Sequence, residues 1–353
     1  MKKIILTGGG TAGHVTPCIA LIPKLIEEGF EIEYIGSFGG IERKMIEDLN
    51  IKYYPVSTGK FRRYLSAANI ADGFKVIKGV ADSFFALKKA KPDIIFSKGG
   101  FVGVPVVIAG KMLGIKSVIH ESDASVGLAN KISIPFASKV CLSFPETLKY
   151  VSEAKAVLTG TPIRKTLFSG NRREGLELCG FDGSKSVMLV MGGSLGSAKI
   201  NAAVKEALPK LTKCFHVAHI CGRGNIDENI KNENYRQFEF VTGELAHLFA
   251  AADIVVSRAG ANAISEIAAL KKPCLLIPLS KAASRGDQIL NAESFEKRGF
   301  AKILYEEDLT DSTLLTEAIN VNANSREYIA KLRGNSLSDG VDEVMRVIKG
   351  CAG

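Results

Sequence analysis

A strand that leads through a glycine loop into a helix occurs twice in this chain, and this pattern constrains the fold more than any other feature. Residues 3–7 are an apolar run, and the segment from Gly8 to His14 follows them before a helical pattern. Residues 186–191 form a second apolar run, and the glycine-rich residues 192–196 follow it about half the chain later. Such a unit is typical of parallel α/β sheets. The sequence therefore predicts an α/β protein with two doubly wound, Rossmann-like domains.

Short apolar runs alternate with helical patterns along almost the whole chain, as expected for parallel strands joined by right-handed crossover helices. In the first helix we expect Pro17 near the first turn and Gly29 at the end. Turn residues at 159–164 are typical of a linker, so we place the domain boundary at residue 162. If both glycine loops face the same way, the two domains would face a central cleft, where we expect the chemistry. Further strands are expected at 31–35, 52–56, 93–97, 116–120, 139–142, 215–220, 254–257 and 274–278.

Composition narrows the class of protein. A chain of 353 residues with 46% hydrophobic content can bury two cores. Its seven cysteines are scattered and include no Cys-x-x-Cys pair, which indicates reduced thiols in a cytosolic protein. Because no apolar run approaches the ~20 residues of a membrane span, we expect a protein that is soluble or lies on a membrane. The net charge of +9 favours anionic partners. No basic-aromatic motif of a single-strand nucleic-acid module occurs, so nucleic acid is not an expected partner.

The first glycine loop carries a candidate catalytic residue. Its backbone can approach a ligand closely, and its N–H groups can meet negative charge. His14 lies at the mouth of the loop, where an imidazole could take a hydroxyl proton near neutral pH. A tight turn required only for packing is the alternative interpretation of the glycines, and a structural role is the alternative for His14.

The second half offers groups that suit a nucleotide and a sugar. Glu266 follows an apolar strand by about one and a half helical turns and could accept hydrogen bonds from a ribose diol. Asp287, Gln288 and Asn291 supply donors and acceptors for sugar hydroxyls, although Asp287 is equally explained as a helix N-cap. The acidic residue that would hold an NAD ribose is unconvincing after either loop. A dehydrogenase is therefore poorly supported.

No metal is expected at the site. The chain contains no Asp-x-Asp, the usual carboxylate pair for a manganese-held nucleotide sugar. Charge on a leaving group would then be met by helix N-termini and by cations such as Arg164. We predict a metal-independent reaction that needs no cofactor.

A basic and apolar stretch lies in the first half, at residues 60–91. Phe74, Ile77, Phe84 and Phe85 recur at nearly helical spacing and are flanked by lysines and arginines. Such a stripe is consistent with docking on an anionic membrane surface, but core packing explains it equally well. The pattern leaves both interpretations open.

Taken together, the motifs resemble the MurG family of glycosyltransferases, which add N-acetylglucosamine to lipid I in bacterial cell-wall synthesis. The resemblance runs from Gly8 to about Arg298. Its blocks are residues 9–14 with Pro17, 98–101, 120–121, 127–131, 160–164, 192–194 and 265–266.

The resemblance implies the GT-B fold, inversion at the anomeric carbon, UDP-N-acetylglucosamine as donor and lipid I, the undecaprenyl-pyrophosphoryl-muramyl-pentapeptide, as acceptor. Domains would then span residues 1–162 and 163–339, with a last helix at about 340–353 packing back on the first. It also implies a peripheral enzyme at the cytoplasmic face of the cell membrane, with roles in cell shape and division and with possible protein partners from cell-wall synthesis.

Carried over by residue, the resemblance places Thr11, His14 and Asn130 at the acceptor and the reacting centre, so His14 is the candidate catalytic base. Asp123 follows a strand of the same domain and is kept as a second candidate. The donor would be held by Thr11, Ala12, Gly13, Arg164, Ser194, Phe240, Val241, Glu266, Asp287 and Gln288. The acceptor would be held by Gly10, Thr11, His14, Phe101, Asp123 and Asn130. Three positions depart from the family pattern, which has Asn at Asp123, Tyr at Phe101 and Gln at Asp287.

Three other functions remain open at this stage. A nonhydrolysing UDP-sugar epimerase, or another UDP-sugar transferase of the same fold, would use a similar scaffold. A nicotinamide oxidoreductase would bind NADH through the glycine loops. A noncatalytic module that binds membrane surfaces would use only the basic and apolar stretch.

Overall fold

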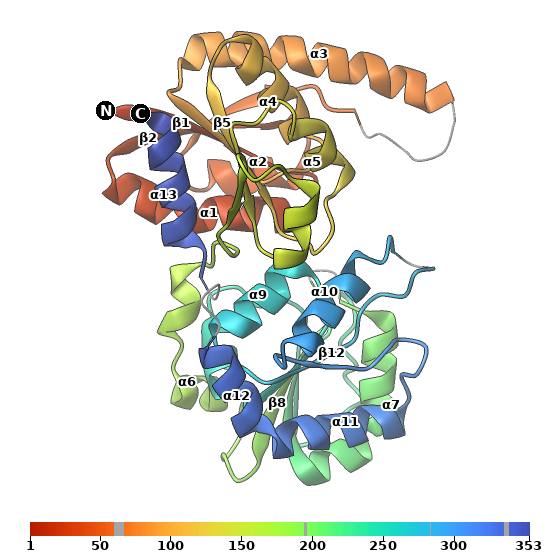
Figure 1. Ribbon diagram of the computed structural model, residues 1–353. Helices are drawn as coiled ribbons and strands as arrows, with labels where there is room; N and C mark the ends of the chain where they lie inside the picture. The colour runs from red at the N-terminus through yellow and green to blue at the C-terminus, as the bar shows by residue number, and fades with distance from the viewer. Residues whose placement is uncertain (60–66, 194–195, 283, 335–338) are drawn as a thin grey trace. The chain divides into compact units, whose positions relative to one another are not determined.

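The computed structural model describes residues 1–353 except 60–66, 194–195, 283 and 335–338 (Figure 1). The chain forms two compact units. Unit 1 comprises Met1–Arg164 and Asp339–Gly353, and unit 2 comprises Lys165–Ser338. These boundaries lie within two residues of those expected from the sequence.

Unit 1 is built on a parallel sheet that has seven strands in the described part of the chain. Their order is β3-β2-β1-β4-β5-β6-β7, and each strand pairs in parallel with its neighbours. The strands are β1 (Lys2–Thr7), β2 (Phe30–Ser37), β3 (Lys52–Val56), β4 (Ile94–Ser97), β5 (Lys116–Glu121), β6 (Lys139–Leu142) and β7 (Ala156–Leu158).

Helices cover both faces of this sheet, and the buried side chains of unit 1 form three clusters among the described residues. One core joins the sheet to α1 (Ala12–Glu27), α2 (Ile41–Glu47) and the C-terminal α13 (Val341–Ala352). A second joins it to α3 (Ala67–Ala90) and α4 (Gly103–Met112), and a third joins α4 to β5 and β6. The short helices α5 (Leu128–Ser133) and η1 (Pro145–Tyr150) complete the unit.

The helix after the first glycine loop begins earlier than the sequence indicated. Pro17 lies inside α1, which starts at Ala12, so the expectation that Pro17 marks the first turn is wrong. Proline here removes the hydrogen bond to the carbonyl of Gly13. The helix tolerates this loss because its inner face, which includes Val15, Cys18 and Leu21, is buried in the core.

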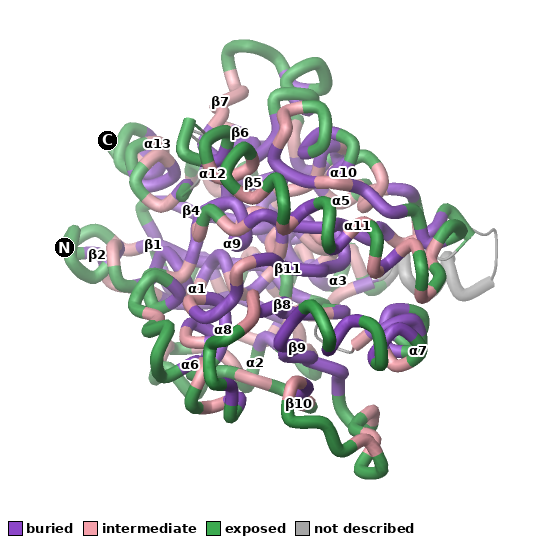
Figure 2. Tube along the Cα trace, turned by 90° about the horizontal axis from the view of Figure 1, so that it is seen from below, coloured by how far each residue is buried: buried purple, intermediate pink, exposed green. Residues whose placement is uncertain are grey.

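Unit 2 repeats the plan with a parallel sheet of six strands among its described residues, in the order β10-β9-β8-β11-β12-β13. The strands are β8 (Ser186–Met191), β9 (Phe215–Ile220), β10 (Tyr235–Phe238), β11 (Ile254–Ser257), β12 (Cys274–Leu276) and β13 (Lys302–Ile303). The helices are η2 (Lys165–Ser169), α6 (Arg172–Cys179), α7 (Ala198–Cys214), α8 (Leu245–Ala251), α9 (Ala261–Ala269), α10 (Asp287–Lys297), α11 (Asp311–Ala323) and α12 (Ser325–Arg333). Figure 2 shows β8, β9 and β11 largely buried.

The sequence located the central strands and the edge strand β3, and it missed the other three edge strands. Strands at 52–56, 139–142, 186–191, 215–220 and 254–257 are confirmed without change. The three that were missed, β7, β10 and β13, all lie at sheet edges. An edge strand is less buried, so it need not be a continuous apolar run. No helix in the described ranges is long and apolar enough to span a membrane.

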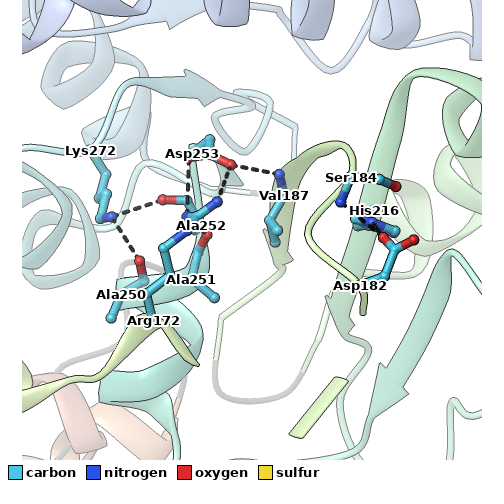
Figure 3. A network of polar contacts seen from close by, with 10 residues as sticks. All are labelled: Arg172, Asp182, Ser184, Val187, His216, Ala250, Ala251, Ala252, Asp253 and Lys272. Atoms are coloured by element: carbon cyan, nitrogen blue, oxygen red, sulfur yellow. Dashed lines mark hydrogen bonds and ion pairs between the residues drawn. The ribbon is translucent and has the colours of Figure 1, made fainter. Parts of the chain in front are cut away.

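Polar contacts hold the amino-terminal edge of the unit 2 sheet, the edge opposite the glycine loop (Figure 3). The carboxylate of Asp253 accepts hydrogen bonds from Val187 N at 2.8 Å and from both terminal nitrogens of Arg172 at 3.1 Å. Nearby, Asp182 Oδ1 lies 2.8 Å from Nε2 of the buried His216 and accepts a hydrogen bond from Ser184 N.

The ionised Asp182 side chain should stabilise unit 2, and this stabilisation should be lost at acid pH. Hydrogen bonds from Ser184 and then His216 lower the pKa of Asp182 from 3.8 to about 2. Since the pKa is depressed in the folded state, the stabilisation is complete well above 3.8 and is lost as the pH falls through about 2. Asp182→Asn should lower the urea midpoint at neutral pH, and the gap to the natural protein should narrow between about pH 5 and about pH 3. A gap that stays constant over this range would contradict the assignment.

Candidate functional site

The loops that carry chemistry in unit 1 meet because their strands are neighbours. Strands β1, β4 and β5 are adjacent and parallel, so their carboxyl ends lie at one edge of the sheet. The loops after them hold the glycine segment 8–11, residues 98–102 and residues 122–127. This is the position at which doubly wound sheets bind ligands.

The first glycine loop brings Thr11 and His14 together. Thr11 Oγ1 lies 3.0 Å from His14 Nδ1, and the side chain of Thr11 makes no capping hydrogen bond to α1. On the other side of the loop, Tyr34 donates a hydrogen bond to the carbonyl of Gly8 at 2.6 Å. When the His14 ring donates its Nδ1 proton to Thr11, Nε2 carries the lone pair that a base needs.

The loop after β4 packs against the first glycine loop. Gly100 has a φ of +74°, and a side chain there would begin 2.5 Å from the carbonyl of Gly9 and 3.2 Å from His14 Nδ1. Only glycine fits such a close approach in that conformation. Phe101 follows Gly100 directly and is half-buried.

Glu121 organises the loop after β5. One carboxylate oxygen accepts a hydrogen bond from Asp123 N at 3.1 Å, and the other accepts from Gly127 N and from Asn130 Nδ2, both at 2.9 Å. Asn130 Nδ2 also donates to the carbonyl of His120, so the amide orientation is fixed. Asn130 Oδ1 is then a buried acceptor with no hydrogen-bond partner.

Three ionisable groups at this edge are buried. Burial lowers the pKa of Lys98, against the opposing charges of Glu121 and Asp123, and its Nζ donates to Ser122 Oγ at 2.9 Å. Burial and the charge of Asp123 raise the pKa of Glu121. Burial and the charge of Lys98 hold the pKa of His120 well below its usual range. His120 is therefore neutral at pH 7 and donates from Nε2 to the carbonyl of Gly160, which is a structural role.

Unit 2 has a pocket of about 600 Å³ at the carboxyl edge of its own sheet. Its walls come from the glycine loop after β8, the start of α7, the segment after β11 and the loop before α10. The polar groups that line it are Ser197, Lys199, Ser257, Arg258, Ser280, Gln288 and Glu306.

A buried arginine is the centre of this pocket wall. The Arg258 guanidinium donates to Ser197 Oγ at 2.7 Å, to the carbonyl of Ile277 at 3.1 Å and to the carboxylate of Glu306. Lys199 Nζ lies 3.3 Å from the other oxygen of Glu306. Burial alone would raise the pKa of Glu306, but hydrogen bonds and charge from Arg258 and Lys199 outweigh it, and the pKa is lowered.

The charges of this wall suit an anion. Two cations share one carboxylate, which leaves net positive charge beside the N-terminus of α7. Ser197 caps that helix by accepting a hydrogen bond from Ile200 N. A helix N-terminus with adjacent cations is a ready site for phosphate groups.

The structure brings together the residues predicted for the acceptor. Gly10, Thr11, His14, Phe101, Asp123 and Asn130 all lie in the loops or first helical turns that follow β1, β4 and β5. The donor residues predicted at Thr11, Ala12 and Gly13 share the first of these loops.

The residues predicted for the donor in the second half are less concentrated. Gln288 lines the pocket and accepts a hydrogen bond from Leu279 N at 3.1 Å. Glu266 on α9 and Asp287 on α10 lie on helices that flank the pocket, and neither is among its lining residues. Phe240 and Val241 follow the edge strand β10, and the ring of Phe240 stacks under Arg223.

Two further donor predictions lie elsewhere. Ser194 lies outside the described residues. Arg164 is the last residue of the first segment of unit 1.

Sequence reasoning missed the polar wall of the pocket. Ser197, Lys199 and Glu306 were not singled out, and Arg258 was given no role. Arg258 and Glu306 are far apart in sequence and meet only because β11, β12 and β13 are neighbours in the sheet. The position of Arg258 directly after an apolar strand was the available signal.

The stripe on α3 divides between core and surface. Ile77 and Phe85 are each 69% exposed, whereas Phe84 is partly buried against the core of unit 1, so core packing explains Phe84 and not the other two. Neighbouring residues on a helix point about 100° apart, so Phe84 and Phe85 cannot share a face. The side chain of Phe74 lies outside the described residues.

No metal site is present in the part of the chain that the structure describes, where no three His, Cys, Asp or Glu side chains cluster in a way that could hold an ion.

The seven cysteines are free thiols, and all except Cys214 are buried.

Two Rossmann-like units, each with a glycine loop at the carboxyl edge of a parallel sheet, form the GT-B fold that many glycosyltransferases share. The glycosyltransferase family 28 N-terminal domain matches residues 4–142, and the C-terminal domain of that family matches residues 187–344. The chain belongs to glycosyltransferase family 28.

Relatives match the chain over its whole length. A protein of Lachnoclostridium phytofermentans named UDP-N-acetylglucosamine–N-acetylmuramyl-(pentapeptide) pyrophosphoryl-undecaprenol N-acetylglucosamine transferase is 55% identical over 99% of both chains. A protein of the same name from Clostridium botulinum is 53% identical over 99% of both chains. The crystal structure of Acinetobacter baumannii MurG is similar with a TM-score of 0.79 and 25% identity, over 99% of this chain and 100% of that one.

Proposed function

We propose that this enzyme transfers N-acetylglucosamine from UDP-N-acetylglucosamine to lipid I, giving lipid II for peptidoglycan synthesis, with inversion at the anomeric carbon. The names of relatives that match 99% of the chain at 53% to 55% identity support this substrate pair. The observation that supports the proposed chemistry most directly is the contact between the side chains of Thr11 and His14 at the start of α1.

His14 is proposed to act as the general base. A hydroxyl of the muramyl sugar loses its proton to His14 Nε2 while its oxygen forms a bond to the anomeric carbon. The bond from that carbon to the phosphate oxygen breaks, and UDP leaves with the electron pair. Thr11 Oγ1 lies 3.0 Å from Nδ1, and when it accepts the Nδ1–H the ring is in the tautomer whose Nε2 is unprotonated. Asp123 stays the second candidate, and the acceptor contact expected at Asn130 stays a prediction.

The leaving UDP is proposed to be stabilised without a metal. In unit 2, Arg258, Lys199 and the N-terminus of α7 present positive charge to one pocket. Gln288 lies in the same wall, where its amide suits a sugar hydroxyl. Fixed cations and helix N-termini can take the place of a bound ion in stabilising leaving-group charge. The other donor contacts expected from the sequence stay predictions.

UDP release in the presence of EDTA tests the reaction. With a short-chain lipid I analogue, the natural protein should release UDP from UDP-N-acetylglucosamine, and release without the analogue should be negligible. His14→Ala should lower the turnover by about 10²- to 10⁴-fold because a general base is lost.

The control is His247→Ala, which removes a partly exposed histidine of unit 2 that accepts a hydrogen bond from Asn171 N. It should keep most of the turnover. UDP release that is equal without acceptor, or epimerised donor among the products, would reject transfer to lipid I and favour an epimerase. Loss of turnover in EDTA would reject the metal-free reaction.

We also propose that unit 1 docks on the anionic cytoplasmic face of the cell membrane, where the lipid-linked acceptor lies. Ile77, Ala81 and Phe85 recur every four residues along one exposed side of α3. Exposed lysines at positions 75, 78, 88 and 89 flank them. An apolar stripe beside cations is suited to a membrane interface. Roles in cell shape and division, and contacts with other cell-wall enzymes, would follow from that location.

Co-sedimentation with vesicles tests the docking face. Phe85→Ser should reduce binding to vesicles that contain phosphatidylglycerol several-fold, because burial of the ring in the interface is lost. Phe168→Ser is a matched control, since Phe168 is an exposed phenylalanine of unit 2. Equal loss in both variants, or no loss in Phe85→Ser, would contradict docking through α3.

A further inference from the structure

A buried carboxylate occupies the first glycine loop. Glu42 lies in the first turn of α2, and its side chain is fully buried. One oxygen accepts a hydrogen bond from Gly10 N at 3.1 Å, and the other accepts from Ser37 N at 3.0 Å and from Ser37 Oγ. The carboxylate therefore has three donors, two of them backbone N–H groups.

Two glycines make room for this carboxylate. A side chain at Gly9 would begin 2.5 Å from the carboxylate of Glu42, and one at Gly40 would begin 2.1 Å from it. Neither glycine has the positive φ that would itself require glycine. Close approach to Glu42 thus explains both residues, whereas the sequence suggested that the loop glycines admit an external ligand.

Aromatic residues hold the same loop from the neighbouring strands. Tyr34 donates to the carbonyl of Gly8 and stacks on Tyr53, with ring centroids 5.9 Å apart. Tyr53 donates in turn to the carbonyl of Ser37 at 2.7 Å. Ser37 is the residue that donates twice to Glu42, so the loop, β2, β3 and α2 form one connected network.

The position of Glu42 determines what the loop can bind. In glycine loops of this kind, backbone N–H groups usually receive a ligand phosphate. Here Gly10 N–H already donates to a carboxylate. A phosphate at the same N–H would have to displace Glu42, and two anions in contact in a buried setting repel each other strongly.

We infer that Glu42 is a built-in anion of the first glycine loop, which closes Gly10 N–H to substrate phosphate and fixes the backbone that carries Thr11 and His14. Glu42 is a positioning residue, since it acts through the loop and touches no reacting atom. The inference rests on the proposed function in one respect, because it takes His14 as the base. Its exclusion of phosphate stands on the geometry alone.

Two substitutions at position 42 test the positioning role. Glu42→Gln keeps the size but turns an NH₂ group toward an N–H donor, so one hydrogen bond to a charged group is lost. That loss corresponds to roughly a 10- to 100-fold lower kcat, with the KM for UDP-N-acetylglucosamine changed less than about twofold. Glu42→Ala should lower kcat at least as much, and added acetate should restore part of it by filling the vacated space. Acetate should not raise the kcat of the natural protein.

The matched control is Glu47→Gln on the same helix. Glu47 is exposed and pairs with Arg43 at 2.9 Å. It should leave both kcat and KM unchanged. Two results would overturn the positioning role. One is a kcat of Glu42→Gln equal to that of the natural protein, and the other is a lowered kcat of Glu42→Ala that acetate does not restore.

Binding of inorganic pyrophosphate tests the exclusion without any turnover. Calorimetry should find one pyrophosphate site in the natural protein, competed by UDP, and a second site that UDP does not compete in Glu42→Ala. A second pyrophosphate site in the natural protein would overturn the claim that Glu42 excludes phosphate from Gly10 N–H. A single pyrophosphate site in Glu42→Ala would overturn it as well. If the natural protein does not transfer sugar, the proposed function is wrong. The pyrophosphate experiment still tests whether Glu42 excludes phosphate, because it needs no turnover.

Discussion

Three buried carboxylates, each held by several donors, fix the loops on which both units depend. Glu42 holds the first glycine loop, Glu121 holds the loop after β5, and Glu306 holds Arg258 in the wall of the unit 2 pocket. A buried carboxylate is costly unless it is hydrogen-bonded, and loops leave backbone N–H groups that need acceptors. Glu42 and Glu121 meet this need by accepting hydrogen bonds from backbone N–H groups of their loops, whereas Glu306 is paired with the side chains of Arg258 and Lys199. The loops thereby gain a defined shape where α/β sheets bind ligands.

The two units use this arrangement for different chemistry. Unit 1 presents the His14 imidazole beside Thr11, and its glycine loop already contains an anion. Unit 2 presents Arg258, Lys199 and a helix N-terminus around an open pocket. One fold, used twice, thus yields one loop suited to a hydroxyl and one pocket suited to a diphosphate.

The sequence predicted features that are local and missed those that depend on packing. Central strands were found because burial on both faces makes them continuous apolar runs, while the edge strand β10 was missed because Arg236 is exposed. His14 was found because a glycine loop and its following helix are contiguous in sequence. The pairing of Arg258 with Glu306 had no sequence signal, since it depends on strand order. The sequence could not decide between core packing and surface exposure for Phe84, because periodicity alone does not distinguish the two sides of α3.

Calorimetric titration with UDP tests the division between the two units most directly. Lys199→Ala removes an exposed cation from the unit 2 pocket, and it should weaken UDP binding about tenfold because a hydrogen bond to a charged group is lost. His14→Ala should bind UDP as the natural protein does, although its turnover is lost. Weakened UDP binding in His14→Ala together with natural affinity in Lys199→Ala would contradict the account.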